Sequence, residues 1–197
     1  MSDTPTHISL AGRFLIAMPG MGDARFDRSV IYMFAHDNEG AMGFTVNRPT
    51  DGLTLGEIAS NLPASVSETG LRNLPVFVGG PVQPESGFVL HSIEPDTDNT
   101  DHNKNQNTNQ GQVGVTQSLY ILVRAAEGKG PEYMRLVLGY AGWGPGQLEN
   151  EIQENAWLII EADVKDVFDV DVEGLYKRLI GRLGIDLAKL SQSGGEA

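Results

Sequence analysis

The amino-acid sequence predicts a single α+β domain. Its 197 residues are enough for one domain with its own core, and 40% of them are hydrophobic, which is ordinary for a globular protein. Two segments carry the prediction: a strand–turn–helix–strand unit at residues 134–160 and a β-hairpin at residues 29–47. An amphipathic helix at residues 172–183 follows them. Locally paired strands together with separate helices are typical of the α+β class.

The unit at residues 134–160 organises the rest of the sequence. It opens with an apolar run of strand length, which a glycine-rich turn follows. A helix is expected to begin near Gly144 with Pro145 at its first position, where the missing N–H costs nothing. Asn155 is expected to end this helix in the left-handed conformation, before a second apolar strand at residues 157–160.

The turn of this unit contains three glycines, Gly142, Gly144 and Gly146. Their presence has two possible explanations. Free N–H groups at a helix start, opened by glycines, can hold a phosphate or a carboxylate, so the turn is a candidate anion site. Alternatively, the turn needs small residues so that Trp143 can pack. The sequence contains neither of the glycine motifs that bind nucleotide phosphates, which favours the structural interpretation.

The hairpin is expected to have one strongly buried strand. Residues 29–35 are almost continuously apolar, which is typical of a strand buried on both faces. Residues 36–40 have the composition of a turn, and residues 41–47 alternate between apolar and small or polar side chains.

The remaining elements follow from local patterns. Strands are expected at residues 14–18, 76–79 and 87–91, and helices at residues 54–61, 117–127 and 164–169. Thr54 and Glu57 have the spacing of a capping box at the start of their helix. Thr116 is expected to cap the next helix, and Asp171 the last one.

The domain is expected to extend over residues 8–190. Residues 94–112 are almost wholly polar and cannot bury enough apolar area to offset the entropy of ordering, so they predict a flexible insertion loop. Residues 191–197 are expected to form a frayed tail.

Composition excludes several classes of function. The chain has no cysteine, so disulfides, cysteine-bound metals and thiol catalysis are excluded. Its net charge of −12, with only 14 Lys and Arg residues, disfavours direct binding of nucleic acid. The sequence contains no signal peptide and no run of apolar residues long enough to cross a membrane, which predicts a cytoplasmic protein.

Several ordered motifs resemble the YqgE/AlgH family of bacterial proteins. They are FLIAMPGMGDARFDRSVIY, HDNEGAMGFTVNRP, VFVGGPV, GFVLH, GYAGWGPGQLENEI with the following NAWL, and LGID. The resemblance covers residues 13–187. It implies an α+β fold with a bent, partly barrel-like and mostly antiparallel sheet surrounded by helices. One branch of the family is described as a putative transcriptional regulator, and no family reaction is established, so the resemblance supplies no catalytic residues.

Two histidines are candidates for site chemistry. His36 and His91 each end a predicted strand, so the fold could bring them together, with Asp37 and Glu39 close by. Two histidines and one carboxylate can bind a transition metal. No local spacing of metal ligands supports such a site, however, and structural hydrogen bonds are the preferred interpretation.

Two arginines beside strand ends are candidates for ligand binding. Arg28 and Arg48 carry planar guanidinium groups that can bind a carboxylate or phosphate, although ion pairs with neighbouring acids are the simpler interpretation. If a ligand site exists, we expect it where Arg28, His36, Asn47, Arg48 and His91 converge.

These observations favour a non-enzymatic, cytosolic binding or regulatory protein. Its partner is an unknown protein or small molecule, and no metal or cofactor is indicated. The alternative is an uncatalogued hydrolase or metal-dependent enzyme that uses His36 and His91. A third hypothesis, a direct transcriptional regulator, is disfavoured because the sequence contains no helix-turn-helix pair.

Overall fold

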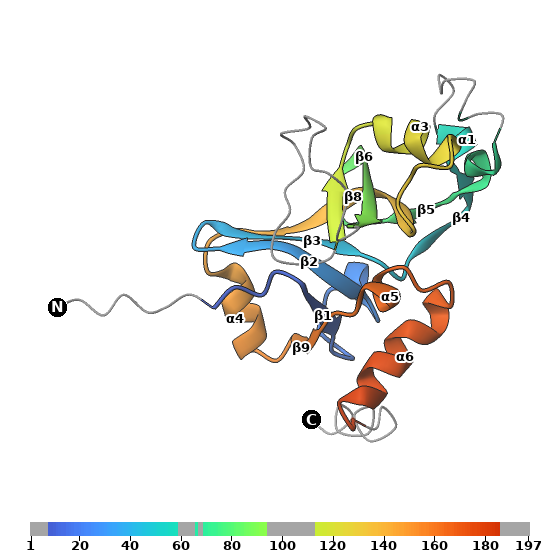
Figure 1. Cartoon of the computed structure of the whole chain (residues 1–197). Coiled ribbons are helices and arrows are strands. Elements are labelled where there is room, and N and C mark those ends of the chain that lie inside the picture. The colour runs from blue at the N-terminus through green and yellow to red at the C-terminus, as the bar shows by residue number, and fades with distance from the viewer. Residues whose placement is uncertain (1–7, 59–65, 67–68, 94–112, 186–197) are drawn as a thin grey trace.

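The computed structural model describes residues 8–58, 66, 69–93 and 113–185, and the predicted loop at 94–112 and tail at 191–197 lie outside these ranges. It confirms a single α+β domain in which helices surround one mixed, mostly antiparallel sheet of nine strands (Figure 1). The sheet bends strongly without closing into a barrel. None of the helices in the described ranges is long and apolar enough to cross a membrane.

The strands follow the order β4-β5-β8-β3-β2-β1-β9, and β6 pairs with both β8 and β7. Their bounds are β1 Arg13–Ala17, β2 Val30–Asp37, β3 Gly40–Thr45, β4 Pro49–Thr54, β5 Pro75–Val78, β6 Val82–Ser92, β7 Val113–Thr116, β8 Met134–Trp143 and β9 Trp157–Glu161. Only β5 and β8 are parallel. The predicted hairpin is confirmed as β2 and β3.

Strand β8 joins the two halves of the sheet. Its first part pairs with β5 and β6, and its last residues pair with β3. Gly139 lies between these two parts of β8. It has a φ of 67°, and a Cβ at this position would lie 2.4 Å from the carbonyl oxygen of Gly80. Glycine is therefore required where β8 changes partners, because any side chain would collide with the neighbouring backbone.

The helices of the described ranges are mostly short. Their bounds are η1 Ala24–Phe26, α1 Leu55–Ile58, η2 Gly70–Asn73, α3 Tyr120–Ala126, α4 Gln147–Gln153, α5 Val164–Val167 and α6 Val172–Arg182, where η marks a 3-10 helix. The predicted capping box forms in part: the Glu57 carboxylate accepts from the Thr54 N–H at 2.7 Å and from the Thr54 hydroxyl at 3.0 Å. Asp171 caps α6 through the Gly174 N–H, and Asn155 ends α4 with a φ of 59°.

Three local predictions were wrong. Thr116 lies in β7, where it pairs with Val89, so α3 begins only at Tyr120. Pro145 precedes α4, because Gly146 is the N-cap residue and the helix begins one residue later. The segment Pro49–Thr54 forms a strand that sequence analysis missed, because proline, aspartate and glycine are depleted in strands. As the edge strand of the sheet, β4 tolerates a proline.

The bent sheet encloses the main core. Phe14, Tyr32 and Phe44 from one half of the sheet pack there with Phe88 from the other half and Leu179 from α6. A second core lies under α4, and a third lies under α1 and α3. The main core thus lies between the two halves of the sheet, which is the partly barrel-like arrangement that the family resemblance implied.

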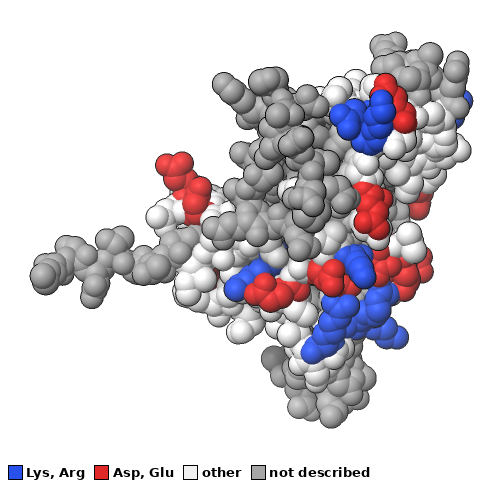
Figure 2. Space-filling view, in the orientation of Figure 1, with Lys and Arg blue, Asp and Glu red and all other residues white. Residues whose placement is uncertain are grey.

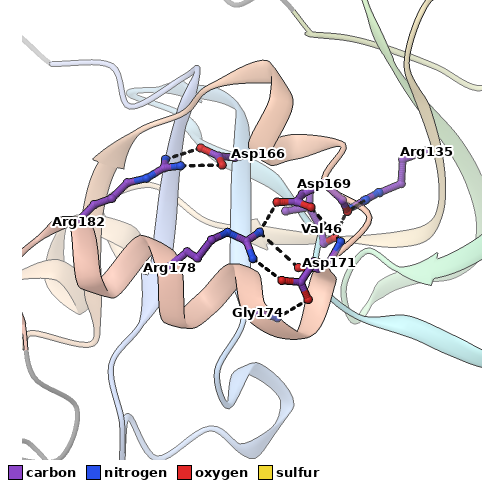
Figure 3. A network of polar contacts seen from close by, with 8 residues as sticks. All are labelled: Val46, Arg135, Asp166, Asp169, Asp171, Gly174, Arg178 and Arg182. Carbon is purple, nitrogen blue, oxygen red and sulfur yellow. Dashed lines mark hydrogen bonds and ion pairs between the residues drawn. The ribbon is translucent and has the colours of Figure 1, made fainter.

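A buried arginine fixes the junction of β8 with the segment between α5 and α6 (Figure 3). The Arg135 guanidinium donates to the carbonyl oxygens of Val46 and Asp169, the latter at 2.6 Å, and lies 4.2 Å from the centre of the Phe77 ring. Burial lowers the pKa of Arg135 to about 10, and nearby Asp169 partly offsets this shift. Arg135 is only 5% exposed, so its guanidinium contacts other groups of the protein and not the solvent.

Further arginines pair with aspartates around α6 (Figure 3). Arg178 forms ion pairs with Asp169 and Asp171, and Arg182 forms one with Asp166. These contacts tie α6 to α5 and to the turn between the two helices. Arg178 and Arg182, two basic residues of the predicted amphipathic helix, thus each have a carboxylate partner.

Candidate functional site

Asn47 and Arg28 lie together where β2 begins and β3 ends. The Asn47 side chain accepts from the Val30 N–H at 2.8 Å and donates to the Arg28 carbonyl oxygen at 2.9 Å. Arg28 has a φ of 52°, a conformation that is uncommon for residues with a side chain. Asn47 therefore holds the backbone at Arg28, and the Arg28 side chain is exposed.

Arg48 lies beside this pair and is bound to the protein itself. Its guanidinium donates to the carbonyl oxygens of Arg25 and Asp27, the latter at 2.7 Å. Arg25 in turn pairs with Asp23, with 2.7 Å between nitrogen and oxygen. The guanidinium of Arg48 thus stabilises the loop that contains η1.

His36 lies at the opposite end of β2, and both nitrogens of its ring make hydrogen bonds. Its Nδ1 accepts from the Leu10 N–H at 3.0 Å, so Nε2 carries the proton and donates to Oε1 of Glu149 at 2.9 Å. The ring is 3% exposed. These contacts link the N-terminal segment, β2 and α4, which is the structural role that sequence analysis preferred.

His91 is buried but only half satisfied. Its Nδ1 contacts the Ser92 carbonyl oxygen at 3.1 Å, and its Nε2 has no hydrogen-bond partner in the part of the chain that the structure describes. A Cβ on Gly114 would lie 2.6 Å from the ring, so the imidazole fills the space that this glycine leaves. Desolvation lowers the pKa of His91.

The predicted convergence of the five residues is wrong. His36 pairs with Ala41, which pairs with Trp143 at the last position of β8. His91 pairs with Met134, the first position of the same strand. The two histidines are therefore separated by the length of β8, and a metal site shared between them is excluded.

The glycine turn is occupied by the chain itself. Gly142 pairs with Met42 inside the sheet, and the Gly144 N–H donates to the Gln147 side chain at 3.1 Å. Glu149 adds a negative charge to the first turn of α4. This geometry supports the structural interpretation of the turn over an anion site.

The turn instead brings two tryptophans onto one carboxylate. The indole N–H groups of Trp143 and Trp157 donate to Oε2 of Glu151 at 2.9 and 2.7 Å. Gln147 donates to the other carboxylate oxygen at 2.9 Å. The two rings meet edge to face, with 5.9 Å between their centres. Glu151 is thus a structural acid that joins β8, α4 and β9.

A groove of about 430 Å³ lies beside the tip of the β2–β3 hairpin. The partly buried side chains of Met42, Val82 and Tyr140 line it, and they combine apolar surface with one aromatic ring. Asp37 and Glu39 add exposed carboxylates from the hairpin turn. We call this surface the hairpin groove. Apolar surface next to exposed carboxylates suits a side chain with an aliphatic stem and a cationic end.

The charged side chains of the segments that line the hairpin groove are all acidic, apart from histidines. The groove residues come from the segments 29–47, 73–93 and 136–164, none of which contains a lysine or arginine. Figure 2 shows acidic side chains at the hairpin tip and basic ones gathered around α6, on the opposite side of this view. The groove was not predicted from the sequence, although the absence of basic residues from these segments was a usable signal.

The side chains of the described residues form no metal site. No three residues among His, Asp and Glu in the described ranges are grouped closely enough to hold a metal ion. The expectation that the protein needs no cofactor stays a prediction.

Comparison with known proteins gives consistent matches over the whole chain. Residues 14–188 match the family model described as AlgH-like. UPF0301 proteins from Paraburkholderia phytofirmans and Verminephrobacter eiseniae are each 42% identical, over 197 and 201 residues, and each match covers 100% of both chains.

Solved structures agree with this result. The solution structure of the AlgH protein from Pseudomonas aeruginosa matches with a TM-score of 0.73 and 36% identity, and the match covers 100% of both chains. A crystal structure from Corynebacterium diphtheriae shares the fold, with a TM-score of 0.69 and 23% identity over 89% of this chain and 87% of that one. These matches confirm the resemblance read from the sequence motifs, and the chain belongs to the AlgH-like family.

Proposed function

We propose that the protein is a non-enzymatic binding protein that holds a basic segment of a protein partner in the hairpin groove. The observation that carries this proposal is the combination, in one shallow groove, of the carboxylates of Asp37 and Glu39 with the apolar side chains of Met42 and Val82 and the Tyr140 ring. A lysine or arginine next to an apolar residue would match both parts of this surface.

The fates of the other candidate residues support a binding role over catalysis. His36, Asn47 and Arg48 are engaged in hydrogen bonds within the fold. The hydrolase hypothesis required His36 and His91 to act together, and β8 separates them. Any effect on transcription would then be indirect and pass through the bound protein.

The test is a titration with two synthetic peptides. The first contains lysines next to leucines, and the second has glutamate in place of each lysine. We expect only the basic peptide to bind, with an affinity that falls as ionic strength rises, because exposed charges are screened by salt. Calorimetry gives the affinity, and backbone amide NMR shows whether Met42 and Tyr140 shift.

Matched variants make the test specific. Replacing Asp37→Asn and Glu39→Gln together should weaken binding about tenfold, a loss of roughly 1.4 kcal/mol over two contacts. The control replaces Asp51→Asn and Glu173→Gln, which removes the same net charge at exposed positions outside the groove. If both double variants bind equally well, general charge attraction explains the binding and the groove is not the site.

A further inference from the structure

A second cavity lies where the bent sheet fails to close. Its volume is about 620 Å³, and it is bordered by β1 and β2, by the segment that follows β9, and by Val113 at the start of β7. In the strand order β9 and β7 are the two outermost strands of their halves. We call this space the seam cavity. Its volume lies within the range of small-molecule sites, which are often found at the mouths of barrel-like sheets.

The Tyr32 phenol lines the seam cavity, and its hydroxyl has no hydrogen-bond partner among the described residues. Tyr32 lines the cavity, yet its side chain belongs to the main core and is 2% exposed. Its ring meets Phe14 edge to face, and its hydroxyl makes no hydrogen bond to any residue in the described ranges. Burial raises the pKa of Tyr32 to about 12, so the phenol stays protonated and can donate. The phenol oxygen is not among the polar atoms that are fully buried without a partner, so it is accessible from the cavity and can donate to a ligand oxygen there.

Charges of both signs stand at the same cavity. Arg13 pairs with Glu161 at 2.9 Å, and the two side chains are 35% and 78% exposed. Asp163 also lines the cavity, and its Oδ1 accepts from the Lys165 N–H at 2.9 Å. An exposed ion pair contributes little to stability, so its two partners can turn to a ligand at small cost.

We propose that the seam cavity binds a small zwitterion, an amino acid or a dipeptide. The ligand carboxylate pairs with Arg13, its ammonium group pairs with Glu161 and Asp163, and an oxygen of its inner end accepts from the Tyr32 hydroxyl. The carboxylates of Glu161 and Asp163 would repel a simple anion, and the Arg13 guanidinium would repel a simple cation. A zwitterion can pair with groups of both signs. This site is separate from the hairpin groove and does not depend on it.

The test uses three dipeptides that differ only in charge. Glycyl-glutamine carries both charges, its N-acetyl form lacks the ammonium group, and its C-terminal amide lacks the carboxylate. We expect glycyl-glutamine to give saturable amide NMR shifts at Tyr32 and Val113. Each neutralised form should bind at least about fivefold more weakly, as the loss of one charge-assisted contact predicts.

Two variants assign the contacts. Tyr32→Phe keeps the ring and should weaken glycyl-glutamine about fivefold, whereas Tyr120→Phe, on the surface of α3, should change nothing. Arg13→Gln should abolish the advantage of glycyl-glutamine over its amide, while Arg72→Gln, an exposed arginine of η2, should keep it.

Three results would overturn the proposal. One is the absence of saturable shifts with glycyl-glutamine in the folded wild-type protein. Another is equal affinity for all three dipeptides, which would exclude recognition of a zwitterion. The third is wild-type affinity in both Tyr32→Phe and Arg13→Gln, which would place the ligand elsewhere.

Discussion

The two ends of the β2–β3 hairpin use charge in opposite ways. At the end near α6 each basic side chain described above, apart from the exposed Arg28, is bound within the protein. Arg48 and Arg135 donate to backbone carbonyls, and Arg25, Arg178 and Arg182 pair with aspartates. At the hairpin tip Asp37 and Glu39 are exposed, and the surrounding segments contain no basic residue.

This difference separates charges that hold the fold from charges that are available to a partner. A buried guanidinium must be hydrogen-bonded, because an unpartnered charge in the interior is costly. An exposed carboxylate stays hydrated and contributes little to stability. Substitution of the buried Arg135 should therefore change stability, and substitutions at the tip should change binding.

Arg135 gives the largest expected effect. Arg135→Met keeps the apolar stem but leaves the carbonyl oxygens of Val46 and Asp169 without their donor and removes the contact with the Phe77 ring. We expect a loss of about 3 kcal/mol in the free energy of unfolding, measured by urea denaturation. Arg72→Met, at an exposed position, should cost less than about 0.5 kcal/mol. Equal losses in the two variants would contradict a structural role for the buried cation.

Glu151 lies near the groove but accepts hydrogen bonds from two tryptophans, so its removal should lower stability. Glu151→Ala leaves the indole N–H groups of Trp143 and Trp157 without their acceptor, so we expect a loss of about 2 kcal/mol. Tryptophan fluorescence reports this unfolding directly, because the chain has only these two tryptophans. Glu154→Ala, an exposed neighbour, is the control and should be nearly neutral. An unchanged midpoint in Glu151→Ala would mean that the indole contacts add nothing to stability.

His91 gives the smallest effect, and it depends on pH. Its pKa is lowered in the folded state, so below about pH 6.5 the unfolded chain binds a proton that the folded protein does not. The wild type should therefore lose stability as pH falls through this range, by at most about 1.4 kcal/mol per pH unit. His91→Gln should show a shallower decline between pH 7 and pH 5, measured by urea denaturation at several pH values. Parallel curves for the two proteins would exclude the contribution of this histidine.

Local sequence patterns were sufficient for much of the fold. The hairpin at residues 29–47 and the unit at residues 134–160 were predicted because each pairs or packs with its own neighbours in the chain. The Asp171 cap and the Asn155 helix end were predicted because backbone geometry of this kind depends on one or two residues. The family motifs added the bent, barrel-like shape of the sheet.

Three features depend on the tertiary structure alone. They are the formation of strand β4, the positions of the two histidines relative to each other, and the presence of the hairpin groove and the seam cavity. The segment Pro49–Thr54 has little strand propensity and becomes a strand because β5 offers it an edge. His36 and His91 each end a strand, but strand order places them at opposite ends of β8. Tyr32 lies in a continuous apolar run that predicts burial and nothing more. Its phenol reaches a cavity only because β7 and β9 do not meet, and that is a property of the whole sheet, which no local pattern encodes.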